Sequence, residues 1–161
     1  MTNYWIVGAW NLRHAVRNGV VGEWAITVTR KASSISQGDK ALIYILKRSP
    51  HNPSGKGAGC FVGDFTVDSS PVKVHGPWIW ADHTYEGKTA ESQGFRLRDF
   101  RLWTAFVEKG EAINHGADFN LGRLRAGQGL IQISREAYLK TIDVYAVAAE
   151  KRSDEKRRSY E

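Results

Sequence analysis

The hydrophobic pattern of the first 20 residues predicts a strand followed directly by a short helix. Residues 4–8 read Tyr-Trp-Ile-Val-Gly, which is typical of a buried strand. Asn11 is a good helix N-cap because its side chain can accept the free amide N–H groups of the first turn. We expect the helix over 11–19, since Asn18 and Gly19 both tolerate the left-handed conformation. Trp10 then lies at the rim of a sheet, where it either lines a ligand site or closes the end of a barrel.

Alternating or continuous apolar runs predict further strands over 23–29, 40–46, 59–67 and 72–80. The segment 49–57 is rich in Pro, Gly, Asn and Ser, so the strands on either side of it should form a hairpin with a long basic tip.

The segment 95–107 has an interrupted alternation. Residues 95–98 alternate strictly, and 100–102 resume with the opposite parity. We therefore expect one long strand that ends near Val107 and contains a bulge or bend at Asp99. Further on, Ser134 is expected to cap a helix that runs through Ile142, with a last short strand over 144–148.

These elements predict an α+β, mostly β fold. Five to six strands, with two or more short helices, are typical of a closed or half-closed barrel whose ends the helices plug. A length of 161 residues fits one domain. We expect that domain over 1–149. The tail 150–161 mixes charges of both signs without an apolar face and is expected to be disordered and solvated.

Composition and charge narrow the classes of partner. The formal net charge of +6 favours a polyanion. No apolar run approaches the roughly 20 residues that a membrane span needs, and the N-terminal segment lacks the features of a signal peptide. The single cysteine, Cys60, lies in an apolar run and is read as a buried thiol in a reducing cytoplasm. We expect a cytoplasmic protein without a membrane partner.

Motifs for catalysis or metal binding are absent from the sequence. The five histidines are scattered without metal-ligand spacing, and one cysteine cannot build a thiolate zinc site. Neither a Gly-x-Ser-x-Gly elbow nor a glycine-rich phosphate loop before a helix is present. We therefore expect no catalytic residues, no metal and no cofactor.

Aromatic residues interleaved with basic ones are the remaining signal. Of the six tryptophans, Trp5 and Trp103 sit in strand patterns and are expected in the core. Trp78 and Trp80 would share one face of an extended segment, which is either core or a platform on which a nucleobase stacks. Basic residues that could hold phosphates lie on the first helix and in turns: Arg13, Arg17, Arg30, Lys31, Lys47, Arg48 and Lys56.

The order of several short motifs resembles that of the EVE domain. These motifs are Tyr4-Trp5-Ile6-Val7, Gly19-Val20-Val21-Gly22, Ile35-Ser36-Gln37-Gly38-Asp39-Lys40, Leu121-Gly122-Arg123-Leu124-Arg125-Ala126-Gly127 and Ile133-Ser134-Arg135-Glu136-Ala137-Tyr138. The resemblance covers roughly residues 3 to 145. It implies a PUA-like pseudo-barrel, related to YTH, ASCH and SRA-type domains, that receives a flipped and often modified base in an aromatic-lined pocket.

The resemblance also implies which residues form that pocket. The expected set is Trp10, Asn11, Val21, Gly22, Trp24, Trp78 and Trp80. Val21 stands where YTH domains carry a cage tryptophan, so an N6-methyladenine cage of that type is not expected. A smaller pocket for 5-methylcytosine or a related 5-modified cytosine fits better. EVE-like domains occur in modification-dependent restriction systems, which favours DNA as the target and a separate nuclease as a further partner.

The sequence thus leads to three hypotheses. The first is a non-catalytic reader that flips a modified base out of DNA, in which Trp78 or Trp80 stacks on the base and Asn11 and backbone amides near Gly22 bond its edge. The second is a reader of a modified base in RNA. The third, from another class, is a small ASCH-like hydrolase of a modified nucleoside, for which Lys31, Thr29 and Glu23 would have to meet in the pocket.

Overall fold

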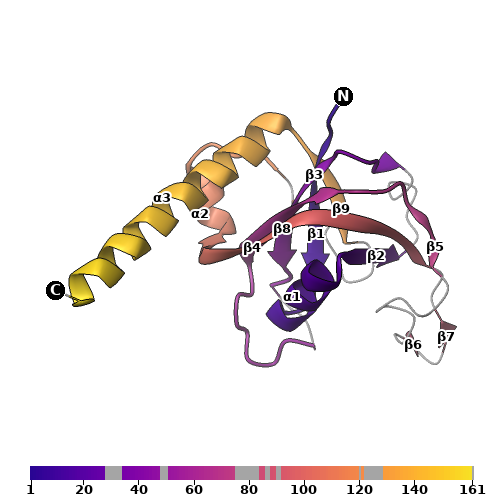
Figure 1. Cartoon of the computed structure of the whole chain (residues 1–161), viewed down its shortest axis with the longest axis horizontal. Coiled ribbons are helices and arrows are strands. Elements are labelled where there is room, and N and C mark those ends of the chain that lie inside the picture. The colour runs from indigo at the N-terminus through magenta and orange to yellow at the C-terminus, as the bar shows by residue number, and fades with distance from the viewer. Residues whose placement is uncertain are drawn as a thin grey trace.

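The described residues fold as a curled, mostly β structure with three helices (Figure 1). The computed structural model describes residues 1–27, 34–47, 51–74, 84–85, 88–89, 92–119, 121 and 129–160. The elements in chain order are β1 (Tyr4–Ala9), α1 (Leu12–Val21), β2 (Glu23–Thr27), β3 (Lys40–Ile45), β4 (Cys60–Val67), β5 (Val72–Val74), β6 (Thr84–Tyr85), β7 (Lys88–Thr89), β8 (Ser92–Glu108), α2 (Lys109–Asn114), β9 (Leu130–Ile133) and α3 (Arg135–Tyr160).

One sheet organises the fold, with the strand order β2-β8-β4-β3-β1-β9. Strand β5 also pairs with β8, and β6 pairs with β7 in a separate hairpin. Strand β1 lies between β3, which runs parallel to it, and β9, which runs antiparallel. The antiparallel pairing of β3 with β4 confirms the expected hairpin. The architecture confirms the predicted α+β fold class and is consistent with a PUA-like pseudo-barrel.

The central strands are buried on both faces, which explains why their sequences are almost continuously apolar. In β1, Trp5 and Val7 enter a core that includes Ala15 of α1, whereas Ile6 enters a second core that includes Tyr138 of α3. The side chains of β3 alternate between the same two cores. Trp5 and Trp103 are 1% and 2% exposed, so their prediction as core residues is confirmed.

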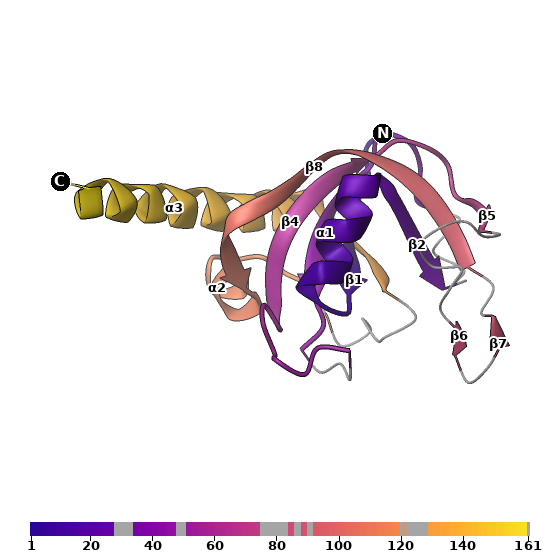
Figure 2. The ribbon, with the colours of Figure 1, turned by 60° about the horizontal axis from the view of Figure 1, so that its bottom comes forward.

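The phase slip at Asp99 is a β-bulge, as the alternation predicted. Asp64 of β4 pairs with Arg101, but Thr66 pairs with Arg98, so β8 carries one extra residue in this interval. Asp99 itself has a φ of 54°, in the left-handed region. Figure 2 shows the result: β8 arches around α1 and joins the β2 side of the sheet to the β4 side.

Helix α1 starts as predicted and ends two residues later than predicted, at Val21. The Asn11 side chain accepts the His14 N–H at 2.7 Å, which confirms the N-cap. Gly19 lies inside the helix and allows it to approach β8 closely, since a Cβ at this position would lie only 2.4 Å from the Phe100 ring. Gly22 ends the helix instead, with a φ of 82°.

Helix α3 differs most from the sequence-based expectation. The predicted end at Ile142, the strand over 144–148 and the disordered tail from 150 are all replaced by helix that continues to Tyr160. The stretch 135–160 contains neither Gly nor Pro and is rich in strong helix formers. Two contacts with β8 hold its middle, where Tyr145 stacks on Trp103 and Arg152 donates to the Thr104 carbonyl. Neither α2 nor β9 was predicted.

The far half of α3 projects from the body of the protein (Figure 1). Within the described part of the chain, no helix combines the length and the apolar character that crossing a membrane requires.

Candidate functional site

Trp10 lies directly after β1 and packs between aromatic neighbours. The exposed imidazole of His51 stacks on it, with ring centroids 4.7 Å apart and planes at 24°. His14, one turn into α1, lies 5.3 Å from the same indole in a tilted arrangement. The half-buried Trp10 therefore joins a surface loop to the first turn of α1.

The aromatic contacts continue from Trp10 into the core. His14 lies 5.6 Å from Trp24 of β2, and Trp24 stacks on Phe65 of β4 at 5.6 Å. Phe65 in turn lies 5.9 Å from Phe95 of β8. We call the outer part of this series, His51, Trp10, His14 and Trp24, the aromatic row. It runs along the side of α1 from the protein surface to a fully buried indole.

Polar side chains on this side of α1 are buried. The Trp10 backbone N–H donates to His14 Nδ1 at 3.1 Å, so the neutral imidazole carries its proton on the buried Nε2. Asn18 is one helical turn beyond His14 on the same face. Its side chain is 0% exposed, and neither its amide nitrogen nor its amide oxygen has a hydrogen-bond partner among the described residues. The same holds for Nε1 of Trp24, within the same part of the chain.

These buried polar atoms require an explanation, because leaving one unpaired costs about 1–3 kcal/mol. Folded proteins pair nearly all such groups with protein atoms or ordered water. The amide of Asn18 offers both donors and an acceptor, and the Trp24 indole adds a donor. An amide of this kind can bond the adjacent donor and acceptor on the edge of a nucleobase. A ligand or an ordered water that reached these atoms would supply the missing partners.

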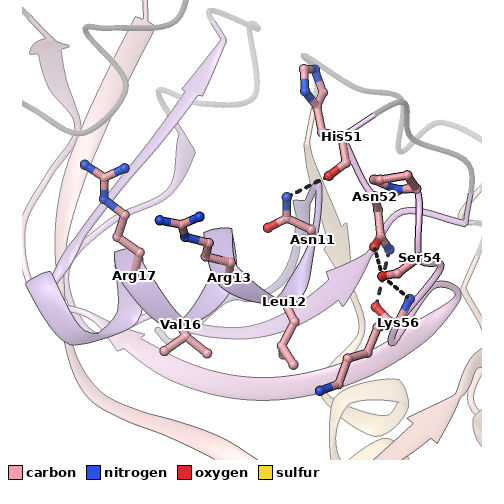
Figure 3. Close-up of a pocket in the computed structure, with 10 residues that line it drawn as sticks. Asn11, Leu12, Arg13, Val16, Arg17, His51, Asn52, Ser54 and Lys56 are labelled. Atoms are coloured by element: carbon pink, nitrogen blue, oxygen red, sulfur yellow. Dashed lines mark hydrogen bonds between the residues drawn. The ribbon is translucent and has the colours of Figure 1, made fainter.

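A cleft of about 620 Å³ separates α1 from the loop 51–56 (Figure 3). Its lining includes the apolar side chains of Leu12 and Val16 and the basic side chains of Arg13, Arg17 and Lys56. In Figure 3, the two arginines extend from one side of α1, whereas Leu12 and Val16 point to another.

The two arginines are placed where they do not stabilise α1. Arg13 lies in the first turn, at the positive end of the helix dipole. Arg17 follows at i+4, where two like charges repel each other, and α1 contains no acidic residue. In the described ranges of the chain, neither arginine forms an ion pair. Both charges are therefore available to an anionic partner.

The structure assigns structural roles to Asn11 and Gly22, two residues predicted for the base pocket, and leaves a third, Val21, exposed. The amide group of Asn11 is occupied at both ends, since its oxygen caps α1 and its nitrogen donates to the His51 carbonyl at 2.9 Å. The Gly22 N–H donates to the Asn18 carbonyl, and the Gly22 carbonyl accepts the Leu97 N–H. Val21 is 53% exposed at the end of α1.

Of the remaining predicted site residues, Trp24 and Lys47 lie in the described parts of the chain and five others do not. Trp24 is 0% exposed, so it contributes to the aromatic row from inside the core. Lys47 is exposed after β3 and is not part of the cleft lining. Five residues lie outside the described parts of the chain: Trp78, Trp80, Arg30, Lys31 and Arg48.

Sequence reasoning missed His14, Asn18 and His51. Asn18 was read only as a helix exit, although its spacing from His14 places both on one helix face. The shared face of these two residues indicates a candidate site only once the structure shows that this face is buried. His51 carried no signal, because its contact with Trp10 joins residues that are 41 positions apart.

The free thiol of Cys60 is half-buried and lies near two carboxylates. Burial raises its pKa, and the nearby carboxylates of Glu108 and Glu111 raise it further, so the thiol is protonated at neutral pH. Among the residues that the structure describes, no group of three or more His, Cys, Asp or Glu side chains could hold a metal ion.

Comparison with known proteins supports the fold. No protein-family model and no curated protein sequence matches the chain. Among solved structures, the N-terminal domain of McrB from Staphylothermus marinus is similar over 89% of this chain and 94% of its own, with a TM-score of 0.58 and 14% identity. ASCH from Zymomonas mobilis is similar over 88% and 94%, with a TM-score of 0.56 and 13% identity.

A third similar structure is human THYN1, solved in complex with DNA that contains 5-methylcytosine. The match covers 89% of this chain and 98% of the human one, with a TM-score of 0.57 and 10% identity. At these identities the similarity concerns the fold, which this chain shares with these three structures.

Proposed function

We propose that this protein is a non-catalytic, EVE-type module that binds nucleic acid and reads a modified base, with 5-methylcytosine in DNA as the favoured target. The observation that carries the proposal is the pair of buried polar groups, the Asn18 amide and the Trp24 indole N–H, beside the aromatic row. Two further observations support it: the basic cleft along α1, and the shared fold with a human protein solved with 5-methylcytosine DNA.

The chemistry of cytosine complements these groups. The Asn18 oxygen can accept the exocyclic N4–H of cytosine, while the Asn18 N–H donates to the ring N3. The Trp24 N–H is a further donor for a base acceptor. Extruding a base from a duplex costs a few kcal/mol. Stacking on aromatic side chains contributes about 1–3 kcal/mol per base and offsets this cost.

The methyl group alone supports only modest discrimination. Burying one methyl group contributes about 0.8 kcal/mol, which is roughly fourfold in affinity. Easier flipping of the modified base, or a polar group left unpaired against the plain one, would add to this value. We expect about 4- to 50-fold preference for methylated over plain cytosine, with duplex DNA bound at least as well as RNA.

Competition binding tests the proposal directly. Matched DNA and RNA oligonucleotides carrying plain, 5-methylated or 5-hydroxymethylated cytosine would compete with a labelled methylated duplex. Selective displacement by the methylated DNA is the expected result. Equal affinity for every cytosine variant would remove the reader function, whereas preference for a modified RNA would favour the RNA alternative.

Hydrolysis of a modified nucleoside is a second candidate, because ASCH structures are among the similar folds. Its sequence requirement was a meeting of Lys31, Thr29 and Glu23. Glu23 is the described member of that set, and its carboxylate lies 3.8 Å from the guanidinium of Arg96. We rank this candidate below the reader. Release of a free base or ammonia from modified nucleosides, followed by chromatography, would reverse that order.

A further inference from the structure

The aromatic row reaches the protein surface at His51. This residue is not one of the groups proposed to bond the edge of the recognised base. His51 stacks on Trp10 at 4.7 Å, in the geometry that a nucleobase would adopt on the indole. The Asn11 amide donates to the His51 carbonyl and thereby anchors the loop in this position. The exposed imidazole of His51, rather than Trp10, is therefore the outermost aromatic group of the row.

His51 also lies at the edge of the basic cleft (Figure 3). The lining of the cleft combines the apolar side chains of Leu12 and Val16 with the positive charges of Arg13, Arg17 and Lys56 and includes no acidic side chain. This is the chemistry of a nucleotide site, in which apolar surface contacts sugar and base while the cations hold a phosphate.

We propose that this cleft binds the nucleotide adjacent to the recognised base in the same strand. Its base stacks on the imidazole of His51, and Arg13, Arg17 and Lys56 hold the phosphates on either side of it. The inference rests on the proposed function, since it places a flanking nucleotide next to the flipped one. The aromatic row provides the continuity, because it leads from His51 to the buried groups beside Asn18.

The charge pattern of α1 is consistent with such a role. Arg13 opposes the helix dipole and repels Arg17, as described above. Removing the charge of Arg13 should therefore not lower the stability of the fold. A residue whose charge serves binding at the expense of local stability is typical of a functional site.

The test compares a ligand that supplies only the recognised base with one that also reaches the cleft. The first is the nucleoside 5-methyl-2′-deoxycytidine, and the second is a single-stranded trinucleotide with 5-methylcytosine in the middle. Affinities are measured by calorimetry for the full chain and for R13Q/R17Q, H51A and H51F. The variant R157Q/R158Q removes two exposed arginines at the far end of α3 and serves as the matched control.

We expect the trinucleotide to bind more tightly than the nucleoside. H51A should weaken trinucleotide binding about 5- to 150-fold, the equivalent of one lost stacking contact, and H51F should restore it. R13Q/R17Q should weaken trinucleotide binding and flatten its salt dependence by roughly 1.4 log units per log unit of salt. R13Q alone should keep the melting temperature of the wild type or raise it. None of these variants should change the affinity for the nucleoside.

Two results would overturn the flanking site. The first is that R13Q/R17Q has the same trinucleotide affinity and salt dependence as the control R157Q/R158Q. The second is that H51A leaves trinucleotide affinity unchanged, or weakens nucleoside binding as much as trinucleotide binding. Failure of the proposed function has a different signature, in which trinucleotides with plain and methylated cytosine bind equally well.

Discussion

The three tryptophans that the described core buries differ in what their indole N–H groups bind. Nε1 of Trp5 donates to the Asp39 carboxylate at 2.9 Å, and Nε1 of Trp103 donates to Asp64 at 2.6 Å. Nε1 of Trp24 has no partner among the residues that the structure describes. All three indoles belong to the same sheet and are almost completely buried. The difference therefore arises from their neighbours and not from burial.

The same difference in the pairing of polar groups separates the surroundings of α3 from those of α1. Beside α3, Arg101 Nε donates a hydrogen bond to Asp64 Oδ2 at 2.9 Å, and Arg101 Nη2 forms an ion pair with the same oxygen at 2.8 Å. The guanidinium also lies over the Tyr145 ring, which stacks on Trp103 at 4.4 Å. Beside α1, the Asn18 amide is buried without a described partner, and Arg13 and Arg17 lack ion pairs within the same residues. Among the described residues, Asp64, Arg101 and Trp103 on the α3 side pair with one another, whereas Asn18 and Trp24 on the α1 side keep unpaired polar atoms, for which the proposed function supplies a base as partner.

Truncating Trp103 should have the largest effect on stability. Trp103→Ala removes a buried ring, its stacking on Tyr145 and a hydrogen bond to Asp64, and should lower the free energy of unfolding by about 3–5 kcal/mol. Urea denaturation followed by circular dichroism measures this change. Trp10→Ala is the control, because the half-buried Trp10 should cost less. A loss for Trp10→Ala as large as that for Trp103→Ala would contradict the contrast between the two sides.

Changing Asn18 should have a smaller effect of opposite sign. Asn18→Leu replaces an unpaired buried amide with an apolar group of similar size, so the free energy of unfolding should rise by up to about 1–3 kcal/mol. Binding of 5-methylcytosine DNA should fall in the same variant, since the base edge loses its partner.

Asp64→Asn is the matched control for Asn18→Leu. It weakens the charge-assisted bonds of Asp64 with Arg101 and Trp103 and should destabilise the protein by about 1–3 kcal/mol. Thermal and urea unfolding of both variants, with binding measured in parallel, compares the two sides directly. A large destabilisation by Asn18→Leu would mean that Asn18 is structural and that the site lies elsewhere.

Local patterns in the sequence predicted the elements that local chemistry determines. The N-cap at Asn11, the hairpin of β3 and β4 and the bulge at Asp99 each follow from a few neighbouring residues. The predicted end of α3 was wrong because the mixed charges after residue 150 resemble those of a solvated tail. The 26-residue helix contains neither Gly nor Pro, and the stacking of Tyr145 on Trp103 holds it against β8. The candidate site was predicted in part. Trp10 and the cleft arginines were identified, but the role of Asn18 depends on tertiary packing that no local pattern contains.

The smallest predicted effect is an alkaline loss of stability that originates on the α3 side. Burial raises the pKa of the Tyr138 hydroxyl above its usual value of 10.0; the Asp64 carboxylate adds to this effect and Arg101 opposes it. Below pH 10 the hydroxyl is protonated in both the folded and the unfolded state, so it has no effect. Above pH 10 the unfolded chain releases the proton while the folded chain keeps it, and the free energy of unfolding falls by at most about 1.4 kcal/mol per pH unit. Tyr138→Phe should flatten this fall relative to the wild type, with both proteins compared at pH 8 as a reference. Urea denaturation at pH 8, 10 and 11 measures it, and equal slopes for the two proteins would show that Tyr138 does not couple the α3 side to pH.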